Sequence, residues 1–274
     1  MKLRNTFLLL VFILSGCATN PFTGKKTLAF VSDDELFPMA FAQYDQVLEE
    51  SKVIKGTRDA EMITRVGQRI AKAAERWLNA NGYQGYLDNY EWEYNLIDSD
   101  QVNAWCLPGG KIAFYKGILP VALNETGIAI IMGHEVAHAL ANHGQQRMSK
   151  GMIQQVGAGA VAAATSTETM EEQQLYMAAY GLVSTYGFMM PYSRKHENEA
   201  DKIGLIISAI AGYDPDEGAR LWERMKANSG GESPPEFMST HPSNDKRIEE
   251  LKKLSPIAKA EAKKFDITSF RPIY

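Results

Sequence analysis

Residues 134–138 read His-Glu-Val-Ala-His, a pentapeptide whose residue types and spacing can bind a catalytic metal. Residues four apart lie on one face of a helix, so the imidazoles of His134 and His138 can point to one tetrahedral zinc ion. Glu135 would then stand beside the metal and act as the general base towards a water molecule. The alternative is a pair of hydrogen-bonded core histidines with an incidental glutamate. The chain has only 5 histidines, so composition predicts a chance match in roughly one sequence in a hundred.

The sequence around the pentapeptide favours a metal. Between Thr126 and Gln146, Glu135 is the only side chain with a formal charge. So apolar a run predicts a buried helix, in which a carboxylate and two imidazoles are costly unless something satisfies them. A bound zinc ion would satisfy all three groups.

A third ligand is expected in residues 191–201, which read Pro-Tyr-Ser-Arg-Lys-His-Glu-Asn-Glu-Ala-Asp. Pro191 ends the preceding segment, and Ser193 can cap a new helix. On that helix Glu197 and Asp201 share a face, and a catalytic zinc usually takes three protein ligands. Glu197 can therefore bind the metal, while Asp201 accepts the second ring N–H of a histidine ligand. The alternative is an ordinary charged helix start.

Together these motifs resemble the HtpX-like and CAAX-prenyl-protease-like zinc metallopeptidases, which are gluzincins. The matching segments span most of residues 25–253 and are His134-Glu135-x-x-His138, Ser193-Arg194-x-x-Glu197-x-x-Ala200-Asp201, Asn103-Ala104-Trp105-Cys106-Leu107-Pro108-Gly109-Gly110, Gly212-Tyr213-Asp214-Pro215, and Ser239-Thr240-His241-Pro242 with Arg247. The resemblance implies one zinc ion per chain, bound by His134, His138 and Glu197. It also implies that Glu135 is the catalytic base and that Asp201 orients a ligand.

The role of the last motif stays open between alternatives. His241 is a candidate for a second donor to the oxyanion, or for a movable ligand that plugs the site at rest. Arg247 could serve alongside His241 or instead of it. A third possibility is that Thr-His-Pro simply caps the last helix.

The predicted fold is α+β and mostly helical: a zincin-like metallopeptidase with a small β-sheet whose edge strand flanks the active-site helix. Residues 33–50 and 58–80 show helical apolar spacing, whereas residues 90–96 alternate as a strand does. Short extended pieces follow, and helices predominate from residue 124 onward. The resemblance implies that Asn103 and Ala104 belong to the edge strand, where an extended substrate adds as another strand.

The N-terminus resembles the export signal of a bacterial lipoprotein. Lys2 and Arg4 precede an eight-residue apolar stretch that is too short to span a bilayer. The following Leu-Ser-Gly-Cys resembles a lipobox, which implies that Cys17 is lipidated and becomes the first residue. Ala18 rather than an aspartate comes next, which implies the outer membrane and its periplasmic face. The alternative is an ordinary secretory signal.

We therefore expect a signal peptide over residues 1–16, a lipid anchor and tether over 17–32, and a metallopeptidase domain over 33–274. No segment after residue 16 reaches the roughly 18 apolar residues of a membrane span, so the resemblance is to the lipoprotein, Oma-type branch. Residues 151–165 are rich in Ala, Gly and Val but include Gln154 and Gln155. They favour a close-packed helix over membrane insertion.

The expected function is that of a zinc-dependent endopeptidase of the bacterial cell envelope. It would cut unfolded or membrane-associated proteins in protein quality control and contact the membrane through its lipidated N-terminus. A net charge of −4 without a basic tract gives no indication of nucleic-acid binding. The alternatives are a non-catalytic zinc-scaffold lipoprotein that acts as a chaperone or binding module, and an exopeptidase, which would need a blocked cleft end.

Overall fold

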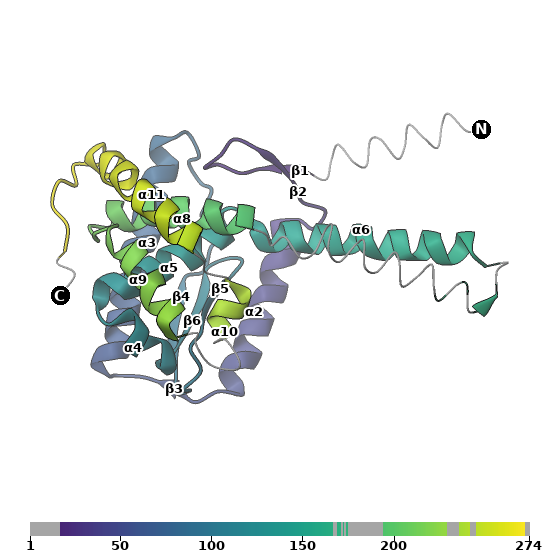
Figure 1. Ribbon diagram of the computed structural model, residues 1–274, viewed down its shortest axis with the longest axis horizontal. Coiled ribbons are helices and arrows are strands. Elements are labelled where there is room, and N and C mark those ends of the chain that lie inside the picture. Colours follow the sequence, from purple (N-terminus) through teal and green to yellow (C-terminus); the bar gives the residue numbers. More distant parts are fainter. Residues whose placement is uncertain are drawn as a thin grey trace. The chain divides into compact units, whose positions relative to one another are not determined.

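The computed structural model describes residues 17–166, 169, 170, 172, 174, 194–228, 236–241 and 245–271. The chain divides into two compact units. Figure 1 shows their elements, coloured by position in the sequence. The first unit comprises Met1–Leu36 and Asn142–Glu197, and the second comprises Phe37–Ala141 and Asn198–Tyr274. The boundary at Glu197 lies inside one continuous helix, α8 (Arg194–Ile210), so Glu197 is held by a helix whose body belongs to the second unit.

The second unit contains a four-stranded sheet in the order β3-β4-β6-β5. Its strands are β3 (Val53–Ile54), β4 (Glu93–Ile97), β5 (Ala104–Leu107) and β6 (Lys111–Tyr115). The β4–β6 pair is parallel, whereas the β3–β4 and β5–β6 pairs are antiparallel. Among the described strands β5 pairs with β6 alone, so it is an edge strand, and it packs along the helix that carries residues 134–138.

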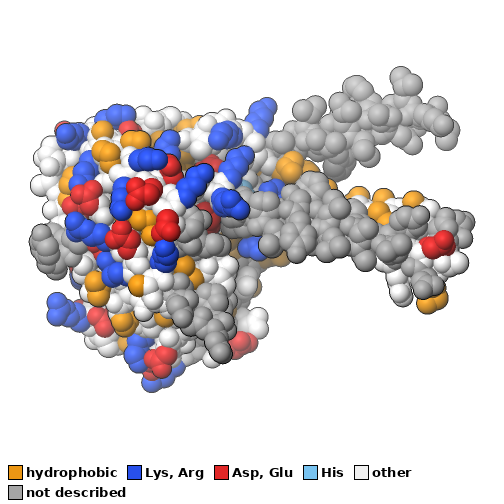
Figure 2. All heavy atoms as spheres, viewed as in Figure 1, with side chains coloured by type: hydrophobic (Ala, Val, Ile, Leu, Met, Phe, Trp, Pro, Cys, Tyr) orange, Lys and Arg blue, Asp and Glu red, His pale blue; other side chains and the backbone are white. Residues whose placement is uncertain are grey.

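Helices surround this sheet. They are α2 (Asp33–Glu49), α3 (Arg58–Ala80), the short η1 (Lys116–Ile118) and α4 (Leu119–Ala122), α5 (Glu125–Leu140), α8, α9 (Glu217–Asn228), α10 (Glu236–Thr240) and α11 (Asp245–Lys263). On the face shown in Figure 2, acidic and basic side chains are intermingled over the second unit. Several of them pair, as Lys252 does with Glu223 and Glu249.

Helix α5 lies at the centre of the second unit. The Asn124 side chain caps its start by accepting a hydrogen bond from the Gly127 amide, which is 2.9 Å away. Every residue from Thr126 to Leu140 is buried, as the apolar run predicts. α3 packs against α5 and β4 with a face that includes Ile63, Val66 and Ile70. Helix α5 is therefore held on several sides, which fixes the position of its polar residues.

Two glycines allow α5 and α8 to cross closely. A Cβ atom built on Gly204 would lie 2.8 Å from the backbone nitrogen of His134 and from the carbonyl carbon of Gly133. One built on Gly133 would lie 2.4 Å from Oγ of Ser208, and that hydroxyl donates a 3.1 Å hydrogen bond to the Ala129 carbonyl. The backbones of the two ligand-bearing helices are therefore in contact at these glycines, where a larger residue would not fit.

The first unit contains a β-hairpin and a long helix. Strands β1 (Cys17–Thr19) and β2 (Lys26–Leu28) pair antiparallel, so the segment expected to be a tether contains ordered structure. Hydrogen bonds join the base of helix α6 (His143–Ala164) to the chain after β2. The Gln145 side chain donates to the Val31 carbonyl at 2.6 Å, and the Phe30 amide donates to the Ser149 hydroxyl at 3.0 Å.

Residues 151–164 form the expected helix but not the expected close packing. Within the described part of the chain, most of their side chains are exposed, because this half of α6 extends beyond the contacts that hold its base. No single described helix is long and apolar enough to cross a membrane. One bent pair, Lys116–Ala122 with Glu125–Leu140, reaches that length and composition, but α5 is a buried core helix.

The predicted fold class is confirmed. The second unit is mostly helical, it has a small mixed sheet, and the edge strand β5 lies beside the helix that carries the His-Glu-Val-Ala-His motif.

Candidate active site

Three buried imidazole rings meet beside helix α5. His134 and His138 are one turn apart on α5, and their Nε2 atoms are 3.1 Å apart. His241, which follows α10 directly, brings its Nδ1 to 3.1 Å from Nε2 of His134. The three ring centroids lie 4.7, 5.0 and 5.2 Å apart. Nitrogen atoms that converge in this way are arranged as ligands of one ion.

Glu197 completes this group from the first turn of α8. One ligand atom from each of His134, His138, Glu197 and His241 lies within 4.8 Å of the others, and all four residues are buried. Ligands bound to zinc at about 2.0–2.1 Å with tetrahedral angles are themselves about 3.3 Å apart. The two nitrogen–nitrogen separations of 3.1 Å are close to that value. Donor types and spacing therefore fit zinc.

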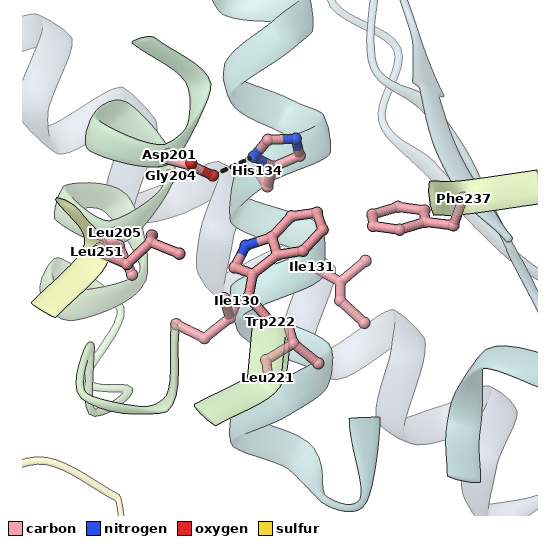
Figure 3. A pocket seen from close by; sticks show the side chains of 10 residues that line it. All are labelled: Ile130, Ile131, His134, Asp201, Gly204, Leu205, Leu221, Trp222, Phe237 and Leu251. Atoms are coloured by element: carbon pink, nitrogen blue, oxygen red, sulfur yellow. Dashed lines mark ion pairs between the residues drawn. The ribbon is translucent and has the colours of Figure 1, made fainter. Parts of the chain in front are cut away.

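Asp201 sets the orientation of His134. Its Oδ1 lies 3.0 Å from Nδ1 of His134, as the dashed line in Figure 3 shows. Burial alone would raise the pKa of Asp201, but the Arg247 guanidinium and His134 outweigh it and keep the pKa below its usual value. The carboxylate therefore stays ionised and accepts the Nδ1 proton. This leaves the Nε2 lone pair of His134 directed at the ligand cluster.

Arg247 has a different role from the one expected of it. Its Nε and Nη2 each donate a 2.7 Å hydrogen bond to Asp201, and both residues are buried. Its guanidinium lies 3.7 Å from the centre of the Trp222 ring. Arg247 therefore supports the carboxylate that orients His134. Arg247 thus acts on the metal ligands through Asp201.

Trp222 separates the ligand cluster from the apolar interior. It lies edge-on to His134, with ring centroids 5.9 Å apart, and stacks on Phe237. Behind these rings is a cavity of about 10 Å³, enough for a single water molecule. Its walls are mostly apolar side chains such as Ile130 and Leu205, as Figure 3 shows. The cavity is too small to admit a substrate side chain.

Glu135 stands beside the ligand cluster. It is buried, and its Oε1 lies 3.5 Å from Nε2 of His241. Burial and the nearby Glu135 carboxylate raise the pKa of the Cys106 thiol on β5. The Cys106 thiol and the Glu135 carboxylate thus lie close to each other, between the edge strand and helix α5.

The edge strand begins where the sequence motif predicts. Ala104 is the first residue of β5, and its amide is hydrogen-bonded to the Asn103 side chain at 2.9 Å. The Asn103 carbonyl accepts a 3.0 Å hydrogen bond from the Tyr115 amide, which continues the pairing with β6. Asn103 and Ala104 therefore lie at the edge of the sheet nearest the motif helix.

Sequence comparison decides the family. The model of peptidase family M48 matches residues 58–255. The chain belongs to peptidase family M48. It is 30% identical over 247 residues to the mitochondrial metalloendopeptidase OMA1 of Schizosaccharomyces pombe, a match that covers 90% of this chain and 68% of that protein. It is 35% identical over 220 residues to OMA1 of Saccharomyces cerevisiae, with 77% and 60% covered.

A bacterial protein is also similar to this M48 chain. The beta-barrel assembly-enhancing protease of Escherichia coli is 29% identical over 167 residues, with 57% of this chain and 33% of that protein covered. The chain thus spans between one third and about two thirds of the relatives it matches. The buried His, His, Glu and His cluster is the zinc site of an M48 metalloendopeptidase, and the expected cofactor is confirmed.

Two residues of this site were not anticipated from the M48 motifs. Phe237 lies four residues before His241, with ring centroids 4.7 Å apart, and its amide donates a 3.1 Å hydrogen bond to the Val102 carbonyl. Trp222 is buried and contacts both His134 and Arg247. The i, i+4 spacing of Phe237 and His241 could have indicated that the two rings lie on one face of a helix. Trp222 had no such signal, because nothing near it in sequence binds the metal.

Proposed function

We propose that this chain is a zinc-dependent endopeptidase that cuts unfolded or membrane-associated proteins in quality control of the bacterial cell envelope. The observation that carries the proposal is the convergence of His134, His138 and Glu197, with the Glu135 carboxylate beside them. A pure binding scaffold gains nothing from a buried carboxylate at that position. The names of the M48 relatives, metalloendopeptidase and beta-barrel assembly-enhancing protease, support the class of reaction and an envelope role.

A zinc ion held by His134, His138 and Glu197 would act as a Lewis acid towards the scissile carbonyl and would lower the pKa of the attacking water. Glu135 accepts the proton of that water and then passes it to the amine of the departing product. Asp201 and Arg247 hold His134 in one tautomer and one orientation throughout. The edge of β5 offers backbone groups to an extended substrate, which favours unfolded or mobile chains over folded ones.

The position of His241 supports a latent resting state. Its Nδ1 lies 3.1 Å from Nε2 of His134, a separation typical of two ligands of one zinc ion. His241 thus takes the fourth ligand position, which a catalytic zinc site keeps for water. We therefore assign His241 as a fourth ligand that must leave before a substrate is cut. The short helix α10 that precedes it can carry that movement.

Membrane attachment through Cys17 belongs to the same proposal. Residues 1–16 lie outside the described residues, and the lipobox-like sequence is its support. Growth of the producing bacterium with labelled fatty acid would label the wild-type chain but not Cys17→Ser. Label in neither chain would remove the anchor from the proposal, without affecting the peptidase assignment.

The peptidase assignment is tested with an unfolded protein such as casein, with and without a chelator. Glu135→Gln should keep its zinc and lose all cleavage, because the substitution removes only the base. Glu49→Gln, an exposed glutamate at the end of α2, is the matched control and should cut as the wild type does. Cleavage retained by Glu135→Gln would refute the mechanism and favour the non-catalytic scaffold.

A further inference from the structure

The outer half of helix α6 carries an exposed apolar stripe. Its large members are 44% (Met152), 42% (Ile153) and 75% (Val156) exposed. Ala160 and Ala163 are also exposed and follow at helical spacing. We call these five residues the α6 stripe. Large apolar side chains are seldom left so open together without a partner.

The opposite side of the same half-helix is more covered and more polar. Gln154, Val161 and Thr165 lie about half a turn away from the centre of the stripe, and each is half-buried. The helix therefore presents its apolar side outward, as Figure 2 shows along the described part of α6. That is the reverse of the arrangement in a helix that packs on its own core.

The charge pattern of this segment suits a lipid surface. Residues 151–167 contain no Asp, Glu, Lys or Arg, whereas Arg147 and Lys150 lie in the turn just before the stripe. An apolar helical face next to basic side chains is typical of helices that lie in the headgroup region of a membrane with anionic lipids. No single described helix is suited to crossing a bilayer, so the contact would be peripheral.

The stripe belongs to the same compact unit as Cys17. The hydrogen bonds from Gln145 and to Ser149 tie the base of α6 to residues 30 and 31, just after the hairpin that begins at Cys17. Any lipid placed on Cys17 would therefore bring this unit to a membrane. One acyl chain alone binds a bilayer only weakly, so a second apolar contact is what stable attachment requires.

We propose that the α6 stripe docks on the surface of a lipid bilayer and forms a second membrane contact of this chain. The proposal rests on the proposed function in one respect, because the envelope location supplies the bilayer. The contact itself is a property of Met152, Ile153 and Val156 and needs neither the acyl chain nor peptidase activity. A second copy of the chain is the competing occupant, and the experiment must separate the two.

The test uses the chain from residue 17 onward with Cys17→Ser, which retains every described residue except Cys17 and cannot be acylated. Flotation with vesicles of phosphatidylethanolamine and phosphatidylglycerol measures binding, and light scattering without lipid measures oligomeric state. The variants are Ile153→Asp and Val156→Asp. The matched control is Ile257→Asp, because Ile257 on α11 is also 50% exposed but belongs to the second unit.

We expect the unacylated chain to float with the vesicles, and each stripe variant to weaken binding by about tenfold or more. Ile257→Asp should bind as the parent does, and all variants should unfold at similar temperatures. The proposal is overturned if the parent does not float, or if the control loses as much binding as the stripe variants. It is also overturned if the stripe variants only convert an oligomer to a monomer. Casein cleavage in the same preparations reports separately on the proposed function.

Discussion

Arg247 holds Asp201 by two hydrogen bonds of 2.7 Å, both made within the protein interior. Through Asp201 this contact reaches His134 and therefore the metal. A planar guanidinium that grips both carboxylate oxygens fixes the carboxylate in rotation as well as in position. The orientation of the zinc ligand His134 is thus set by Asp201, which Arg247 in turn holds in place.

Arg247→Lys should weaken zinc binding by about 10–100-fold, which is typical when an outer partner of a ligand is lost. Lysine keeps the charge but cannot make the two parallel bonds. Competition with a fluorescent zinc chelator measures the effect. Arg220→Lys, an exposed arginine on α9, is the control and should bind zinc normally. Equal affinity in all three proteins would show that Arg247 has no part in positioning.

Glu197→Ala should reduce bound zinc from about one per chain to a small fraction, because it removes a ligand. Metal analysis after dialysis gives the content directly. Glu199→Ala changes a glutamate two residues away, on the other side of α8, and should keep its zinc. Full zinc in Glu197→Ala would assign the third ligand to another residue.

His241→Ala should raise the rate of casein cleavage above that of the wild type, since it empties the fourth ligand position. The initial rate at saturating zinc is the measurement. Ser239→Ala alters an exposed neighbour on α10 and should leave the rate unchanged. A His241→Ala protein that binds zinc yet cuts less than the wild type would instead give His241 a role in stabilising the oxyanion.

Gly204→Ala should destabilise the fold by about 1–3 kcal/mol, because the new methyl would overlap the backbone of α5 at Gly133 and His134. Urea unfolding gives the change in free energy. Gly159→Ala on α6 meets nothing within 4 Å and should be neutral or stabilising by up to about 1 kcal/mol. If both variants had the same stability, the close crossing would not matter to the fold.

Glu125, at the start of α5, should make stability depend on pH. Burial raises its pKa, but hydrogen bonds from Arg65 and Tyr213 and the charge of Arg69 lower the pKa by more than burial raises it. The net shift is therefore downward from 4.5. A carboxyl with a lowered folded pKa stabilises the fold above its ordinary pKa and loses that contribution as pH falls through the folded value. Wild type should therefore lose stability more steeply than Glu125→Gln below about pH 4.5. The measurement is urea unfolding of both proteins at pH 7 and pH 3.5. An equal loss of unfolding free energy in the two proteins would contradict the prediction.

The zinc ligands were predictable because their spacing is local. His134 and His138 share one helix, and Glu197 and Asp201 share another, so helical periodicity already places each pair. The fold class followed from the same patterns. Sequence could not show how closely the two helices approach, because that depends on Gly133 and Gly204, which are 71 positions apart in the chain.

The residues missed were those defined by long-range packing. Arg247 was one candidate for an oxyanion donor, whereas its contact with Asp201, 46 positions away, could be recognised only in three dimensions. The outer half of α6 was expected to pack closely because its residues are small and apolar. Composition alone does not say whether such a helix has a neighbour, and here its most apolar side is turned outward.

The five-residue helix α10 makes two contacts at once. Its Phe237 amide binds the Val102 carbonyl just before the edge strand, and His241 at its end lies against the zinc ligands. A movement of α10 as one rigid body would break both contacts together. Each molecule should therefore switch on in a single step, so that a graded signal changes how many molecules are active and not how fast each one works.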